Sequence, residues 1–222
     1  MAQRFAADKK APMDIRQHWQ TVYEGRDVST VSWFQPHLTS SLTEIAWAVA
    51  AQGLKPEGAR ILDVGGGAST LVDDLLELGY RGITVLDVAQ SALAVSQRRL
   101  GDRANSVQWI CDDLLFCDRL PEKVHLWHDR AVFHFLCDPE MRARYVDLVR
   151  KTLAVGSHLI VFSFGPDGPQ RCSGLPAMRY SREALASVFD EGFVMVRDQL
   201  ETHRTPAGVD QQFLLAHFLR TE

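Results

Sequence analysis

The chain has 222 residues, of which 46% are hydrophobic and 23% are charged, and its formal net charge is −4. This composition is typical of one ordinary globular domain and excludes a disordered or fibrous chain. The negative charge gives no general attraction to phosphate backbones or to anionic lipid, so we expect neither nucleic acid nor a membrane as a partner.

Targeting patterns and cysteine spacing indicate the compartment. Residues 1–10 lack the apolar core of a secretory signal, and the longest apolar run, residues 45–51, is too short to span a bilayer. No Cys-x-x-Cys pair occurs, so we expect free thiols at all four cysteines, which are Cys111, Cys117, Cys137 and Cys172. The sequence predicts a cytoplasmic protein that is a monomer or a weak homodimer.

Two amphipathic helices are predicted first, over residues 13–25 and 40–53, because apolar residues recur there every three or four positions. Short β-type runs then alternate with helical stretches. The predicted strands are residues 60–64, 82–88, 106–111, 124–127 and 158–164, and the predicted helices are residues 69–78, 90–100 and 139–153. This alternation predicts an α/β fold with a parallel sheet.

The C-terminal part has a different pattern. A loop over residues 165–180 and a helix over 181–189 precede two strand-like runs, 193–202 and 210–220, around a turn with Pro206 and Gly208. These two runs predict a hairpin, which adds an antiparallel edge to the sheet and brings it to seven strands. We expect one structural domain with helices on both faces of the sheet, divided into an N-terminal segment, residues 1–54, and a core, residues 55–222.

A glycine-rich turn, Gly65-Gly66-Gly67, leads from the first predicted strand into a helix and follows Asp63. Glycines let a ligand approach the backbone closely, and the free N–H groups of a helix start favour an anionic group. The Asp63 carboxylate is suited to accept a hydrogen bond from an ammonium group of a ligand. A dinucleotide motif would need glycine where Thr70 stands, which disfavours a nicotinamide oxidoreductase. The alternative is a tight turn without a ligand.

Carboxylates also follow the next two strands. Asp87, with Val88 after it, ends the second strand, where it can accept both hydroxyls of a ribose or cap a helix. Asp112 and Asp113, followed by Leu114, end the third strand, where either can accept from an adenine amine or serve as a cap. Three neighbouring strand ends with carboxylates predict a nucleoside site with room for a cationic amino-acid tail.

The pattern Asp63-x-Gly65-x-Gly67-x-Ser69, with acids after the second and third strands, resembles the class I, seven-β-strand S-adenosylmethionine-dependent methyltransferases. The resemblance covers nearly the whole chain. It implies a Rossmann-like sheet with an N-terminal helical lid, S-adenosylmethionine as cofactor, S-adenosylhomocysteine as product, and no metal. It implies that the glycines hold the methionine part, Asp87 the ribose, and Asp113, or alternatively Asp112, the adenine.

The N-terminal segment resembles the lid of a methyltransferase branch that includes protein-lysine methyltransferases. Trp19-x-x-x-Tyr23 and Trp33-Phe34 match its aromatic pattern, and Asp129-Arg130-Ala131 stands where that branch has Asp-Lys-Gly after the fourth strand. The resemblance implies that Tyr23 and Trp33 cover the cofactor; the alternative is a core stripe. The expected cofactor site comprises Tyr23, Trp33, Asp63, Gly65, Gly66, Gly67, Asp87, Val88, Asp112, Asp113, Leu114 and His128.

Polar residues at the end of the fourth strand are candidates for positioning the acceptor or taking its proton. They are Asp129, Arg130 and His134, with His128 beside them. The alternative is a structural Asp129–Arg130 pair with a packed His134. The histidines lack metal-ligand spacing, so no metal is predicted.

The loop over residues 165–176 is a candidate acceptor-binding element, to which Arg171, Arg179 and Tyr180 would add polar groups. Four functions stay open at this point. The chain can methylate a protein side chain such as lysine, or methylate a small amine, thiol or metalloid. It can bind the cofactor without turnover, or it can be a nicotinamide oxidoreductase.

Overall fold

Seven strands form one sheet in a computed structural model that describes residues 14–25 and 27–222. The strands are β1 (Arg60–Val64), β2 (Gly82–Asp87), β3 (Gln108–Cys111), β4 (Val124–Arg130), β5 (Leu153–Phe164), β8 (Phe193–Arg204) and β9 (Asp210–Arg220). The interpretation of residues 1–10, and the predicted helix start at Met13, lie outside the described residues. Within them, no helix combines the length and apolar character that crossing a membrane requires.

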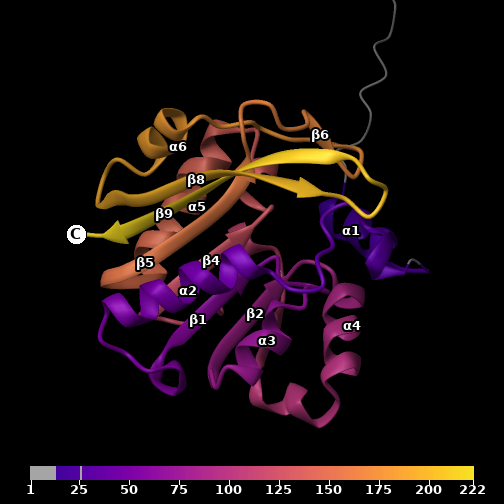
Figure 1. Cartoon of the computed structure of the whole chain (residues 1–222), viewed down its shortest axis with the longest axis horizontal. Coiled ribbons are helices and arrows are strands. Elements are labelled where there is room, and N and C mark those ends of the chain that lie inside the picture. Colours follow the sequence, from indigo (N-terminus) through magenta and orange to yellow (C-terminus); the bar gives the residue numbers. More distant parts are fainter. Residues whose placement is uncertain (1–13, 26) are drawn as a thin grey trace, which may run out of the picture.

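The spatial order of the sheet is β3-β2-β1-β4-β5-β9-β8 (Figure 1). The first five strands in this order run parallel, and β9 runs antiparallel to both β5 and β8. The predicted seven-stranded, mostly parallel sheet with an antiparallel C-terminal hairpin strand is therefore confirmed. Chain order reverses between β1 and β4, and at such a point an open sheet leaves a crevice beyond its carboxyl ends.

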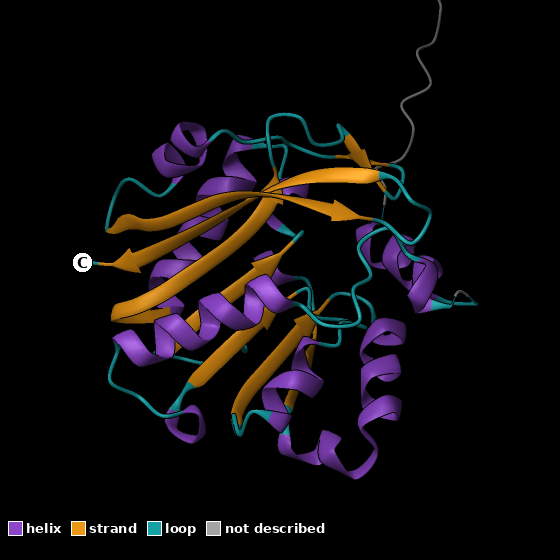
Figure 2. Cartoon of the chain, in the orientation of Figure 1, coloured by secondary structure: helices purple, strands orange, loops and turns teal. Residues whose placement is uncertain are grey.

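Helices cover both faces of this sheet (Figure 2). They are α1 (Ile15–Tyr23), α2 (Thr39–Ala51), α3 (Leu71–Glu77), α4 (Gln90–Leu100), α5 (Pro139–Thr152) and α6 (Arg182–Val188). On one face α2, α3 and α4 pack through Ile45, Leu71 and Leu93 into one apolar cluster, and on the other α5 and α6 pack through Tyr145 and Leu185. Because α2 shares this cluster with β1, the boundary at residue 54 stays a prediction.

The central strands carry side chains that are buried on both sides, as a covered parallel sheet requires. Four of the five residues of β1 are buried. Strand β4 runs to Arg130, three residues beyond its predicted end, although its last residues are polar. It can do so because these polar side chains have hydrogen-bond partners: His128 contacts Asp63, and Asp129 contacts Tyr145.

The loop predicted over residues 165–180 contains a small second sheet. Its strands β6 (Arg171–Cys172) and β7 (Leu175–Pro176) pair antiparallel around Ser173 and Gly174, both at positive φ. The sequence reading did not include this hairpin, because strands of two residues carry no alternation of apolar and polar positions. The hairpin brings Cys172 to the rim where β1, β2 and β4 end.

Candidate functional site

A cavity of about 320 Å³ lies at the carboxyl ends of the central strands. A second, smaller cavity of about 50 Å³ adjoins it and is lined by Asp63, Ser69 and His128, among others. The larger cavity is lined by Asp87, Val88, Asp112, Asp113 and Leu114, and the residues lining both cavities are Tyr23, Trp33, Val64, Gly65 and Arg130. Most of the predicted cofactor residues are therefore brought together around these two adjoining cavities.

The turn after β1 needs its glycines. Gly65 and Gly67 have φ of +68° and +34°, and a Cβ on Gly65 would overlap the Val132 side chain. A Cβ on Gly66 would overlap the Asp63 carboxylate, and one on Gly67 would lie 2.6 Å from Asp87 Oδ2. The two carboxylates consequently pack directly against bare backbone, which leaves main chain exposed to a ligand on the cavity side.

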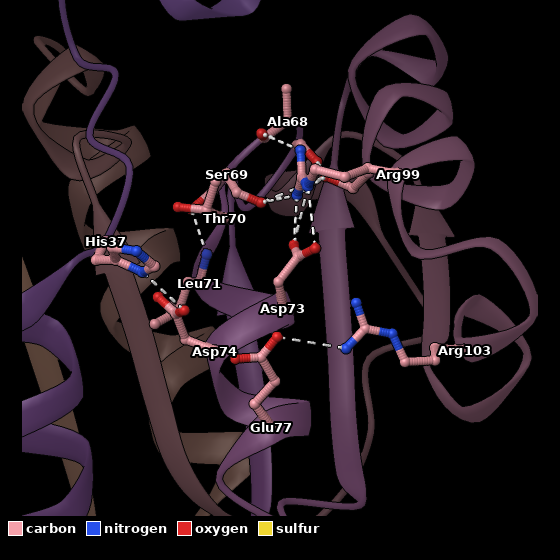
Figure 3. Close-up of polar contacts among 12 residues, drawn as sticks. His37, Ala68, Ser69, Thr70, Leu71, Asp73, Asp74, Glu77, Arg99 and Arg103 are labelled. Atoms are coloured by element: carbon pink, nitrogen blue, oxygen red, sulfur yellow. Dashed lines mark hydrogen bonds and ion pairs between the residues drawn. The ribbon is translucent and has the colours of Figure 1, made fainter.

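An arginine on α4 braces this turn from outside. The Arg99 guanidinium donates to the carbonyl oxygens of Ala68 and Ser69, at 3.1 and 2.6 Å, and to the Asp73 carboxylate at 2.6 Å (Figure 3). It therefore links α4, the end of the glycine turn and the first turn of α3. Arg99 was not among the predicted residues, and an arginine near the end of a helix gives no signal of such a contact.

Asp87 is a buried carboxyl in the wall of the larger cavity. One oxygen accepts from the Ala89 N–H at 2.8 Å. Burial raises the pKa of Asp87 to about 7, and the Asp63 charge adds to this effect. Helix α4 has Ala89 as its N-cap and no side-chain cap, so Asp87 does not cap it.

The two acids after β3 have different surroundings. Asp112 pairs with Arg16 at 3.3 Å and with Arg119 at 3.1 Å. Burial raises the pKa of Asp112, but the hydrogen bonds and charges around it outweigh this and lower it overall. Asp113 accepts from the Leu115 N–H at 3.0 Å as the N-cap of a short 3₁₀ helix, η4 (Leu114–Phe116), and no arginine of residues 14–25 or 27–222 is paired with it. Of the two acids, Asp113 therefore has the carboxylate that is more available to accept a hydrogen bond from a ligand.

Asp63 belongs to a buried relay of three side chains. The Nδ1 of His128 donates to Asp63 Oδ1 at 2.7 Å, and its Nε2 lies 2.9 Å from the Ser41 hydroxyl. All three residues are at most 3% exposed. The relay ties α2 to β1 and β4, and it fixes the orientation of the carboxylate beneath Gly66.

The structure places two of the predicted acceptor residues outside the cavity. Asp129 is fully buried, with Oδ1 accepting from the Val132 N–H at 2.9 Å and Oδ2 accepting from the Tyr145 hydroxyl at 2.7 Å. Burial raises the pKa of Asp129 to about 6. Its carboxylate orders the turn at Ala131, whose φ is +73°, and faces α5. Asp129 has no route to an acceptor in the cavity.

His134 is also fully buried. Its ring stacks on Phe164 at 4.3 Å, and neither ring nitrogen has a partner among the described residues. Burial and the Arg130 charge lower the pKa of His134 to about 3, so the imidazole is neutral. Neither His134 nor Asp129 lines the cavity, and the alternative of a packed side chain fits His134 better.

Arg130 is the predicted acceptor residue that does line the cavity. Its Nη1 donates to the Trp33 carbonyl oxygen at 3.3 Å, and its guanidinium lies over the rings of Phe213 and Phe162, at 5.3 and 6.0 Å. Its Nη2 is buried without a hydrogen-bond partner among the described residues. Among the described residues, the Asp129–Arg130 pair that was the alternative is not formed, because neighbouring residues of a strand point to opposite faces.

Aromatic residues of the N-terminal segment form another wall. Trp19 contacts Trp33 and Phe135 edge to face, at 5.8 and 5.3 Å, and Tyr23 lies 6.1 Å from Trp33. Burial, together with the Asp87 charge, raises the pKa of Tyr23 far above its ordinary value, so its phenol is neutral. The predicted lid residues therefore lie where a ligand on Asp87 and Gly65 would be covered.

Several lining residues were not predicted. Phe116 and Met141 are 66% and 45% exposed and line the larger cavity, and Phe135 and Leu136 extend the same apolar wall. Phe116 follows the Asp112–Asp113 pair by three residues, but the sequence alone does not show that its side chain is exposed. From the loop after β5 the cavity is lined by Cys172, whereas Arg171, Arg179 and Tyr180 do not line it.

Known proteins share this architecture. No family model matches the chain. The human protein EEF1A lysine methyltransferase 2 is 24% identical over 200 residues, which cover 84% of this chain and 77% of that protein.

Solved structures are similar over most of the chain. A protein studied for the conversion of a disulfide bond into a thioacetal during echinomycin biosynthesis has a TM-score of 0.71 and 19% identity, over 93% of each chain. The 1,6-didemethyltoxoflavin-N1-methyltransferase of Burkholderia thailandensis, with S-adenosylhomocysteine bound, has a TM-score of 0.68 and 20% identity, over 93% of this chain and 87% of its own. Magnesium protoporphyrin IX methyltransferase of Synechocystis, with S-adenosylmethionine bound, has a TM-score of 0.67 and 16% identity, over 96% and 100%.

Proposed function

We propose, from the premise that this chain has the class I S-adenosylmethionine-dependent methyltransferase fold, that it transfers the methyl group of that cofactor to an acceptor in the cavity. One observation carries the proposal. Asp87 and Asp113, which suit ribose and adenine, line the larger cavity at the strand ends, and Gly65 and Gly66, which suit the amino-acid tail, line the smaller cavity beside it.

The residues around that space fit the cofactor by size and chemistry. The Asp87 carboxylate has an oxygen beyond the one that accepts from Ala89, and it meets the ribose hydroxyls. Asp113 accepts from the adenine amine, flanked by Val88 and Leu114. The smaller cavity, lined by Asp63 and Gly66, takes the amino-acid end, where the relay with His128 keeps the Asp63 carboxylate oriented.

When bound, the cofactor supplies a methyl group on a positively charged sulfur, which is an excellent leaving group. The acceptor's lone pair forms the new bond to the methyl carbon, the S–C electron pair stays on sulfur, and any acceptor proton leaves to solvent. The protein's task is to align the two and exclude water. Trp19, Tyr23 and Trp33 perform the exclusion, and their ring faces favour the sulfonium charge.

Two acceptor classes have specific support. A protein lysine is supported by the human lysine methyltransferase relative and by the Asp129-Arg130-Ala131 element, in which Ala131 adopts the left-handed backbone typical of glycine. A small molecule is supported by the largely apolar wall of the cavity and by the Burkholderia and Synechocystis neighbours. No contact among the described residues specifically supports cofactor binding without turnover, and none specifically supports a nicotinamide oxidoreductase.

Calorimetric titration with S-adenosylhomocysteine tests the cofactor site. We expect Asp87→Ala to lower the affinity at least about a hundredfold, because two hydrogen bonds to a carboxylate are lost. Asp118→Asn, at an exposed acid in the loop after β3 and η4, is the control and should bind normally. Near-normal affinity of Asp87→Ala would remove this residue from the site.

Transfer of a labelled methyl group tests turnover. The full chain is incubated with labelled S-adenosylmethionine and a cell extract, and the products are then separated by size. Label among macromolecules supports a protein acceptor, and label among small molecules supports a small-molecule acceptor. Binding without any transfer would contradict the enzymatic proposal, and a melting temperature raised by NAD alone would favour the oxidoreductase.

A further inference from the structure

Arg130 is a cation without a counter-ion in the cavity wall. The described residues place no carboxylate within ion-pair distance of its guanidinium, and Nη2 has no hydrogen-bond partner. Glu201 on β8 is near enough to raise the pKa of Arg130 but forms no ion pair with it, while burial acts more strongly to lower it. His134 beside it is neutral. A buried, unpaired guanidinium carries a large desolvation cost, which an anion in the cavity would offset.

The carboxylates of the cavity have other partners or tasks. Asp63 accepts from His128, and Asp112 is paired with two arginines. Asp113 caps η4, and Asp87 lies in the wall assigned to the ribose. No acidic side chain is therefore left, in the part of the chain that the structure describes, to neutralise a cation on the acceptor side of this space.

Apart from these groups, the wall of the larger cavity is largely apolar. Trp19, Phe135 and Leu136 line it, and Phe116 and Met141 are exposed side chains at its edge. The Arg144 guanidinium lies 4.6 Å from the centre of the Phe116 ring, so a second cation lies beside this residue. The charges of the two arginines repel a protonated lysine that approaches the cavity.

We propose that the methyl acceptor is an apolar small molecule with an anionic group, a carboxylate by preference, which pairs with the Arg130 guanidinium and is separate from the methylated atom. Arginine suits this task because its planar donors match a carboxylate. The inference rests on the proposed methyl transfer and names the class of acceptor for that same site. Arg130 is then the residue that selects against a lysine side chain.

The charge of the labelled product tests this inference. The full chain is incubated with labelled S-adenosylmethionine and a cell extract that contains both proteins and small molecules. Small products are then separated by ion exchange into anionic, neutral and cationic fractions. We expect the label in the anionic fraction. Label in protein lysines, or chiefly in neutral or cationic products, would overturn the inference while leaving methyl transfer intact; absence of any label would instead contradict the proposed function.

Variants at the arginine give the second arm. Arg130→Gln should reduce labelling of the anionic fraction at least about tenfold, whereas Arg130→Lys, which keeps the charge, should retain part of it. Arg98→Gln removes an exposed charge from α4 and is the matched control. Equal labelling by Arg130→Gln and the wild type would overturn the inference. If Arg130→Gln fails to fold, the charge of the wild-type product and the labelling of the anionic fraction by Arg130→Lys still test the inference.

A carboxylate is also present on the cofactor's amino-acid tail, and a third arm separates the two sources. The affinities of S-adenosylhomocysteine and of 5′-methylthioadenosine, which lacks that tail, are measured for the wild type and Arg130→Gln. We expect both affinities to change less than about twofold. A loss for S-adenosylhomocysteine but not for 5′-methylthioadenosine would assign Arg130 to the cofactor tail and overturn its role in acceptor choice.

Discussion

At the scale of single residues, the direction of each side chain on β4 decides its role. His128 and Arg130 point toward α2 and the cavity, while Trp127 and Asp129 point toward Tyr145 on α5. Strict alternation along a strand produces this division. The sequence predicted that all the polar residues of this strand end lie at the rim of the sheet, and their backbone positions agree with this. It does not show which face holds the ligand, and Asp129 was therefore given an acceptor role that its contacts do not support.

The affinity for the cofactor should depend on pH through Asp87. The pKa of this buried carboxyl is about 7 without ligand, whereas an ordinary aspartate titrates near 3.8. Only the ionised form accepts hydrogen bonds from two ribose hydroxyls, so binding favours loss of the proton. We expect the affinity for S-adenosylhomocysteine to rise as the pH increases from 6 to 8, with proton release measurable by calorimetry in buffers of different ionisation enthalpy. Asp87→Asn should bind weakly and show no such rise; a pH-independent wild type would contradict the assignment.

At the scale of elements, the contact of Arg99 on α4 with the glycine turn acts on the site although Arg99 does not line the cavity. Arg99 reaches two carbonyl oxygens of the turn and the Asp73 carboxylate, as the close-up shows (Figure 3). Asp74, one residue on, accepts from His37 at 2.9 Å and so joins the segment before α2 to the start of α3.

Removing the brace should weaken binding without touching the ligand. We expect Arg99→Ala to lower the affinity for S-adenosylhomocysteine about tenfold, the equivalent of about 1.4 kcal/mol, because the turn must be ordered on binding. Arg98→Ala on the same helix is exposed and should leave the affinity unchanged. The two affinities are compared by calorimetry, and equal values for the two variants would show that the turn holds its shape unaided.

The turn after β4 depends on a buried network. Trp127 Nε1 donates to the Tyr145 hydroxyl at 2.9 Å, and that hydroxyl donates to Asp129. Tyr145→Phe would leave both partners unsatisfied, so we expect the free energy of unfolding to fall by about 2 kcal/mol. Urea denaturation measures the change, and Tyr80→Phe, a buried tyrosine on the other face of the sheet, is the control. A loss no larger than that of the control would mean that water takes over these hydrogen bonds.

At the scale of the whole molecule, the N-terminal segment is joined to the C-terminal hairpin in two places. Glu44 on α2 accepts from His217 on β9 at 2.7 Å and pairs with Arg197 on β8 at 3.0 Å. Farther along, His203 on β8 donates to the Ser32 carbonyl oxygen at 2.7 Å. These contacts hold the aromatic wall of the cavity against the last two strands.

The histidine pair in this junction should make stability depend on pH. His217 Nε2 lies 3.0 Å from His158 Nδ1, and Trp47 packs on both rings. Burial, and the charge of His217, lower the pKa of His158 to about 4; burial also lowers that of His217, against the effect of Glu44. A depressed folded-state pKa means that stability is present above about pH 6.5, the ordinary histidine value, and is lost as the pH falls toward 4.

We expect the wild type to lose more unfolding free energy than His158→Gln between pH 6.5 and 4, by at most about 1.4 kcal/mol per pH unit. The comparison between variants is needed because Asp87 and Asp129, with raised pKa values, become less costly to bury over the same range. Denaturation curves at several pH values give both slopes. Parallel slopes would show that His158 takes up its proton as readily in the folded chain as in the unfolded one.

Much of this architecture could be predicted because the strands and helices carry local signals. The bounds of β1, α4 and β9 match the predicted ranges 60–64, 90–100 and 210–220. The glycine turn was predicted because positive φ and close backbone approach restrict the residue type. The assignment of Asp87 to a ribose stays a prediction. The Ser41–His128 contact, the Arg99 brace and the Glu44 junction were not found, because each joins positions far apart in the chain through ordinary polar residues.

The order of translation gives the cavity one more property. Trp19, Tyr23 and Trp33 leave the ribosome well before Arg130 and Cys172, which line the same space. The nascent chain therefore contains the aromatic wall of the cavity before most of the other lining residues have been synthesised. S-adenosylmethionine in the cell therefore cannot stabilise early folding intermediates, and it can stabilise only a chain whose synthesis is nearly complete.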